Sequence, residues 1–168
     1  MYNETYIENA GLVILSSFIP VLFERLGLVM DSAFNSVEDQ EKAALLLQYI
    51  LLDNPPKEEH HLVLNKLFVG LPLDHEIKND FSVTPDELNT VHSLIEAVIA
   101  HWSIIGKSTI EGFRGSWLWR NGKLEEMEEN WVLNVEKESY DILLDHLPFS
   151  ISPIKFFWMP KPIMVNWQ

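Results

Sequence analysis

The sequence predicts a mostly α protein with a small C-terminal β-sheet (α+β), in which a compact helical bundle is capped by two or three strands. Up to about residue 120, apolar residues recur at steps of three and four, which is helical spacing. Beyond Gly122 they alternate with polar residues, which is the period of a strand. Apolar residues make up 47% of the 168, enough for one core. We therefore expect a single domain over residues 1–168.

The first two helices are expected at residues 10–28 and 37–52. Pro20 lies in the middle of the first helix and removes one backbone hydrogen bond. A kink or break is therefore expected near residues 16–20. The second helix begins after Ser36, a good N-cap that is followed by acidic residues in the positively polarised first turn.

The third and fourth helices are expected at residues 57–69 and 85–105. Gly70 follows the third helix and suits its C-terminal end. Thr84 and Glu87 have the spacing of a capping box, in which each side chain satisfies a backbone N–H of the other residue. This start signal is the most complete one in the chain.

A fifth helix is expected at residues 109–120. Gly106 ends the preceding helix, and Ser108 and Glu111 have the spacing of a second capping box. The same Gly-Lys-Ser run looks like the end of a phosphate-binding loop. However, His101 stands where such a loop needs its first glycine, so nucleotide binding is not expected.

The C-terminal part predicts strands at residues 130–136, 154–159 and 163–167, and a short helix at 140–147. Alternation of apolar and polar residues is clear in the first and last of these strands. The middle strand is rich in aromatic residues, although Pro153 lies at its start. Together the strands are expected to form the small sheet that caps the helices.

The balance of charge excludes several partners. The chain has 25 acidic and 12 basic residues and a formal charge of -13, which repels phosphate backbones and anionic lipid surfaces. We expect no nucleic acid and no membrane as partner. Without cysteine there are no disulfides and no thiolate metal sites. The apolar run 11–23 follows Glu4 and Glu8, where a signal peptide needs positive charge, and it is too short to span a bilayer.

Histidines and carboxylates gather at residues 58–61, where a metal site has to be considered. His60 and His61 are adjacent, so on a helix they point about 100° apart and lack the i, i+4 spacing of a zinc helix. The carboxylates suit the first turn of the third helix. We expect no catalytic, cofactor-binding or metal-binding residues. A metal-dependent hydrolase using His60 and His61 is the alternative hypothesis.

Aromatic residues indicate a different kind of site. Tryptophan is common at the centres of protein interfaces, although most of the six tryptophans should be core. Trp117 and Trp119 lie two apart and cannot share one helix face, so at least one of them is expected to be available to a partner. Phe157 and Trp158 are adjacent on the expected strand 154–159 and point to opposite sides of it. These four residues are the predicted partner-binding residues.

A series of short blocks runs along almost the whole chain. The blocks are NAGL (9–12), FERLGL (23–28), ALLLQY (44–49), EHHLVLNKL (59–67), GLPL (70–73), AHW (100–102), GFR (112–114), RNGKL (120–124) and DILLDHLP (141–148). Each block alone is an ordinary core or cap pattern. In this order, they resemble the contractile injection system tape-measure proteins, over residues 9–167.

This resemblance implies a role in phage-tail-like particles, where a tape measure occupies the inner tube and sets its length during assembly. Even a wholly helical chain of this size would reach only about 250 Å, and the caps, prolines and strands predict a compact body. We therefore expect an assembly or anchoring module, or a piece of a longer ruler. It would be present in the cytoplasm during assembly and then within the injection particle.

The expected partners are the tube, hub or spike, or baseplate proteins of such a particle. Contact is expected through an apolar-aromatic patch whose acidic surroundings disfavour wrong partners. Self-association into a homo-oligomer stays open. An adaptor that loads effectors is a further alternative, and it predicts reversible binding to cargo.

Overall fold

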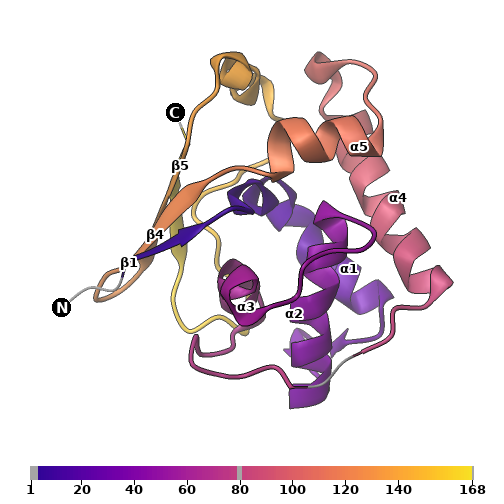
Figure 1. Cartoon of the computed structure of the whole chain (residues 1–168), viewed down its shortest axis with the longest axis vertical. Helices are drawn as coiled ribbons and strands as arrows, with labels where there is room; N and C mark the ends of the chain where they lie inside the picture. The colour runs from indigo at the N-terminus through magenta and orange to yellow at the C-terminus, as the bar shows by residue number, and fades with distance from the viewer. Residues whose placement is uncertain (1–3, 79–80, 168) are drawn as a thin grey trace.

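The computed structural model describes residues 4–78 and 81–167. Helices form one side of the molecule and a four-stranded sheet covers the other, which confirms the predicted α+β class (Figure 1). The sheet is not purely C-terminal, because its first strand comes from the start of the chain. The two ends of the described chain are thereby held in the same sheet.

The first helical region is divided in two. A 3-10 helix, η1 (Ala10–Phe18), is followed by α1 (Ile19–Arg25), with Pro20 in the first turn of α1. Proline suits this position because a first-turn N–H needs no helical partner. The expected helix at 10–28 is therefore too long, and its last residues instead lead into a hairpin of β2 (Val29–Met30) and β3 (Ala33–Phe34).

The second and third helical regions follow their predicted caps. In α2 (Val37–Leu51), the Ser36 hydroxyl accepts a hydrogen bond from the Asp39 N–H at 3.1 Å. The next region comprises a 3-10 turn, η2 (Glu59–His61), and α3 (Val63–Val69), where one helix was expected at 57–69. Gly70 ends α3 with φ of +78°, the left-handed conformation that favours glycine.

The predicted capping box starts α4 (Pro85–His101), with both hydrogen bonds between Thr84 and Glu87 present. The helix ends earlier than expected because Trp102 leaves helical geometry. Its indole N–H donates to the Leu143 carbonyl at 3.2 Å. A 3-10 turn, η3 (Ser103–Ile105), then completes the region predicted as helix.

The next helical region is short and changes from α-helix to π-helix. It comprises α5 (Ile110–Phe113) and a π-helical turn, η4 (Arg114–Leu118). The predicted capping box of Ser108 and Glu111 is wrong by one residue. Thr109 is the N-cap, and its hydroxyl accepts from the Gly112 N–H at 2.9 Å.

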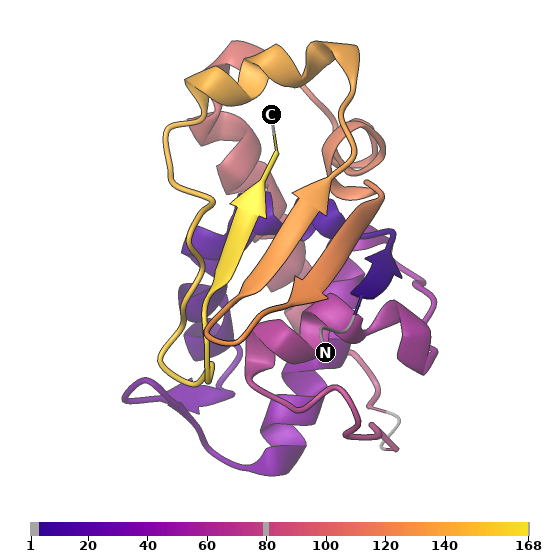
Figure 2. The ribbon, with the colours of Figure 1, turned by 90° about the vertical axis from the view of Figure 1, so that its left-hand side faces the viewer.

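The sheet has the order β1-β4-β5-β6, with antiparallel pairing except for the parallel β5–β6 pair. Its strands are β1 (Glu4–Ile7), β4 (Gly122–Glu126), β5 (Trp131–Val135) and β6 (Ile163–Asn166). Strands β1 and β4 were not predicted, because each carries too few apolar residues to show a clear alternation. Figure 2 looks onto the outer face of this sheet, which no helix of the described chain crosses.

The predicted strand at 154–159 is wrong. Only Ile154 pairs with the sheet, through an isolated bridge to Ile163. The following residues turn back on themselves, and the Met159 N–H donates to the Phe156 carbonyl at 3.0 Å. Prolines on both sides of this run lack the N–H that a strand ladder requires. The helix expected at 140–147 is a 3-10 helix, η5 (Ser139–His146).

A cluster of buried amides lies inside the apolar core. The Asn9 amide donates to Asn65 Oδ1 at 2.9 Å, and the Asn65 amide donates to the Ala44 carbonyl at 2.8 Å. Gln48 accepts from both asparagines and donates to the Pro56 carbonyl. Because each group has a partner, the cluster fixes how the N-terminal segment, α2 and α3 meet.

Candidate partner-binding site

A turn at residues 155–160 brings two of the predicted partner-binding residues together; we call it the aromatic turn. Trp158 anchors it, because its indole N–H donates to the Phe68 carbonyl at 2.7 Å. Its ring packs against Phe34, with centroids 4.9 Å apart. A Cβ on Gly70 would lie 2.3 Å from the Trp158 carbonyl oxygen, so glycine is required for this close approach.

The neighbours of Phe157 in the aromatic turn are also fixed. The Phe156 ring packs edge-on against Phe68 at 5.8 Å, and Met159 is buried. Phe157 lies between these packed residues and is 83% exposed. A large apolar ring on an ordered backbone loses little conformational freedom when a partner covers it. Phe157 is therefore an exposed apolar ring on a packed backbone.

The other two predicted residues lie elsewhere. Trp117 is buried, with its ring 4.6 Å from that of Trp102 and 5.1 Å from that of Tyr140. Trp119 is half-buried and lines a narrow cavity with His60 and His61. The structure thus brings Phe157 and Trp158 together, but separates them from the tryptophan pair.

Beside Trp117 lies a cluster that the sequence did not reveal; we call it the arginine junction. Arg120 forms two hydrogen bonds to the Asp141 carboxylate, at 2.6 and 2.8 Å. Its guanidinium lies 5.2–5.4 Å from the ring centroids of Trp117, Tyr140 and Trp167. The Trp167 indole N–H also donates to Asp141 at 2.9 Å. The junction therefore fastens η4, η5 and the C-terminal strand to one another.

The protonation of this pair follows from its surroundings. Burial alone would raise the pKa of Asp141, but hydrogen bonds from the Arg120 guanidinium, the Glu138 backbone N–H and the Trp167 indole lower it below its usual value. Burial opposes the charge on Arg120, yet Asp141 and Tyr140 raise its pKa further. Both groups are charged at neutral pH, which makes the junction a structural ion pair.

The alternative metal site at His60 and His61 has a different geometry. Their ring centroids lie 4.0 Å apart in η2 with the planes tilted by 41°, and His61 Nε2 lies 3.7 Å from Glu58 Oε2. Within residues 4–78 and 81–167, no group of three or more histidine, aspartate or glutamate side chains is arranged to hold a metal ion. The adjacent histidines therefore contact each other through their tilted rings.

Two further histidine–carboxylate pairs connect separate elements. His92 on α4 lies 2.7 Å from Asp53, which Arg114 also contacts at 3.0 Å. The hydrogen bond from His92 lowers the pKa of Asp53, desolvation opposes this, and Arg114 lowers it further. His75 lies 2.7 Å from Glu41 on α2. Each pair holds a loop or helix end in place.

Comparison with known proteins connects the chain to one family. A family model described as contractile injection system tape measure protein matches residues 2–167. No curated protein and no solved structure matches the chain. Among the described residues, no helix is both long and apolar enough to cross a bilayer.

Proposed function

The chain belongs to the contractile injection system tape measure protein family, and we propose that it is an assembly or anchoring module that binds tube, hub or baseplate proteins through the aromatic turn. The family is structural rather than enzymatic. Its members are components of the injection particle and associate with other proteins of the particle. The finer proposal concerns which surface makes that contact and what it contributes to assembly.

The compact shape supports a module over an extended ruler. The 17 residues of α4 make a helix of only about 26 Å. The chain folds back repeatedly, so that its first and last strands lie in one sheet. A compact module of this kind suits a fixed position in the particle. There it can anchor neighbouring proteins during assembly.

The exposed ring of Phe157 is the observation that carries the choice of surface. Exposed apolar residues are common singly, but this one is displayed by a turn whose other aromatic side chains are packed. Burying a phenylalanine ring contributes roughly 1.5–3 kcal/mol. A partner with an apolar pocket would gain that energy without having to order the turn first.

The test uses the purified full chain and the tube, hub and baseplate proteins of the same particle. We expect co-elution with at least one of them, and Phe157→Ala should weaken that association roughly 10-fold or more. Ile142→Ala is the matched control, because Ile142 is 71% exposed on η5, away from the aromatic turn. The control should bind like the unchanged protein.

Two results would contradict the proposal. One is repeated failure of the chain to associate with any of these particle proteins. The other is association that Phe157→Ala leaves unchanged, which would assign the contact to another surface. Electron microscopy of particles assembled without the chain tests the assembly role itself, which predicts missing particles or particles of altered length.

A further inference from the structure

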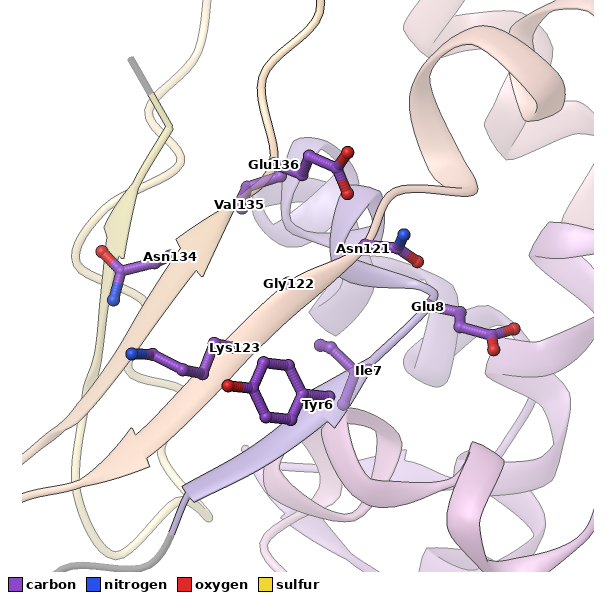
Figure 3. Close-up of a pocket in the computed structure, with 9 residues that line it drawn as sticks. All are labelled: Tyr6, Ile7, Glu8, Asn121, Gly122, Lys123, Asn134, Val135 and Glu136. Atoms are coloured by element: carbon purple, nitrogen blue, oxygen red, sulfur yellow. The ribbon is translucent and has the colours of Figure 1, made fainter.

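The outer face of the sheet carries a groove near the ends of β1, β4 and β5. Three successive rows of residues cross these strands and alternate in direction, as pleating requires. The first row points outwards, the second points into the core and provides a main-chain floor, and the third points outwards again. In that order the rows are Tyr6, Lys123 and Asn134; Ile7, Gly122 and Val135; and Glu8, Asn121 and Glu136 (Figure 3).

The groove is large enough for a side chain of a partner protein. Its volume is about 580 Å³, within the range of roughly 300–1,000 Å³ found for small-ligand pockets. One wall includes the ring of Tyr6, which is 75% exposed. The opposite wall carries the carboxylates of Glu8 and Glu136 on either side of the Asn121 amide. The Tyr6 ring and the two carboxylates thus lie on either side of a main-chain floor (Figure 3).

The negative charges of the groove are not neutralised by cations in its own walls. Glu8 and Glu136 are exposed, and neither forms an ion pair with another described residue. The one cation in the walls, Lys123, pairs at 3.2 Å with both Glu4 and Glu125. Its ammonium group points away from the acidic wall (Figure 3). The acidic wall is therefore open to a cation from outside.

We propose that this groove binds an arginine side chain from a basic segment of another particle protein. A guanidinium group can stack on the Tyr6 ring while its N–H groups donate to the carboxylates of Glu8 and Glu136. A carboxylate accepts such a group through two parallel hydrogen bonds. The inference rests on the proposed function, to which it adds a second contact surface and the chemistry of its partner.

Charge complementarity selects this occupant over a second copy. The chain carries a charge of -13, so two copies meeting at an acidic groove would repel each other. A basic segment of a different protein would instead be attracted, and attraction of this kind also raises the rate of encounter.

The geometry of the sheet favours the face over the β6 edge as the docking surface. Strand β6 is an edge strand, but Ile154 bridges to Ile163 on its outer side. The Ser152 hydroxyl accepts a hydrogen bond from the Val165 N–H at 2.9 Å. Backbone groups that an added strand would need are therefore already occupied there. The outer face has no comparable cover among the described residues (Figure 2).

The experiment measures binding of a short fluorescein-labelled peptide of alternating glycine and arginine to the full chain by fluorescence anisotropy. The matched peptide has citrulline in place of arginine, which keeps the shape and removes the charge. At about 0.15 M salt, where distant charges are screened, we expect roughly 10-fold tighter binding of the arginine peptide. Chemical shifts of the Gly122 amide should move when the arginine peptide is added.

Variants separate the groove from the general acidity of the protein. Glu8→Gln with Glu136→Gln should weaken binding of the arginine peptide roughly 10-fold. Glu96→Gln with Glu111→Gln removes the same charge from α4 and α5, and affinity should stay within about twofold. Tyr6→Ser should weaken binding roughly threefold through loss of stacking.

Three outcomes would overturn the inference. Equal affinity for the arginine and citrulline peptides would show that the guanidinium is not recognised. Equal losses in the two double variants would show that only the overall charge attracts the peptide. A dimer in sedimentation equilibrium that Glu8→Gln with Glu136→Gln dissociates would make a second copy the occupant. Association with particle proteins that still depends on Phe157 would, in each case, leave the proposed function standing.

Discussion

The arginine junction and the aromatic turn use similar side chains in opposite ways. At the junction, three aromatic rings surround the Arg120 guanidinium, and those of Trp117 and Trp167 are buried. In the aromatic turn, the packed residues hold the backbone while Phe157 points into solvent. Aromatic content therefore does not separate the core from the exposed surface in this protein. The direction of each side chain decides it, and buried hydrogen bonds set that direction.

The two regions should differ in what a substitution costs. The arginine junction contains a buried charge pair, so loss of one partner leaves the other charge uncompensated. The exposed ring of Phe157 has no such dependence on its neighbours. We therefore expect changes at the junction to affect folding and changes at Phe157 to affect binding.

The largest expected effect is that of Arg120→Met. Arg120 and Asp141 have side chains that are only 4% and 10% exposed, and breaking a buried pair on one side costs roughly 3–5 kcal/mol. Urea unfolding followed by tryptophan fluorescence measures this loss. The control is Lys123→Met, which breaks two ion pairs at the surface and should cost less than about 1 kcal/mol. Similar losses in both variants would contradict the structural role of the junction.

Trp158→Ala should have the next largest effect and should act on both properties. It removes a ring packed against Phe34 and a hydrogen bond to the Phe68 carbonyl. We expect a loss of roughly 2–4 kcal/mol in unfolding free energy, together with weaker binding to particle proteins. If the folded variant bound particle proteins as tightly as the unchanged protein, the aromatic turn would not be the contact surface.

Acid should weaken the junction in a defined pH range. The folded-state pKa of Asp141 is lowered, so its contribution is fully present above the unfolded pKa of about 3.9. That contribution is lost as the pH falls through the lower folded value. The difference in unfolding free energy between the unchanged protein and Asp141→Asn should therefore shrink below about pH 4. A difference that grows with acid would contradict the assignment.

The smallest expected effect on folding is that of Phe157→Ala. Because the ring is 83% exposed, the unfolding free energy should change by less than about 0.5 kcal/mol. Calorimetry of the purified variant checks this expectation. A larger loss would mean that Phe157 packs within the protein and is not held free for a partner.

Local signals in the sequence predicted much of the helical part. Ser36, Gly70 and the capping box of Thr84 and Glu87 occupy their predicted roles, because caps depend on residues only a few positions apart. Pro20 likewise marks the change from η1 to α1. The family resemblance was also found from ordered blocks along the chain, and the family match confirms it.

The features that the sequence did not predict depend on contacts between distant residues. Strand β1 is short and becomes a strand only by pairing with β4, more than a hundred positions later. The expected strand at 154–159 is replaced by a turn, in which the Trp158 indole bonds to the Phe68 carbonyl 90 positions earlier. Arg120 and Asp141 are 21 positions apart with no motif to connect them. Trp117, one of the four predicted partner-binding residues, is buried. Its spacing from Trp119 did not indicate this burial.

Photo-crosslinking in assembling particles tests the central claim most directly. The photoreactive p-benzoylphenylalanine would replace Phe157 in one sample and Ile142, also exposed, in the other. We expect irradiation to join position 157 to a tube, hub or baseplate protein, with position 142 giving little product. Crosslinks from position 142 alone, or none from position 157 in particles that contain the chain, would contradict the account.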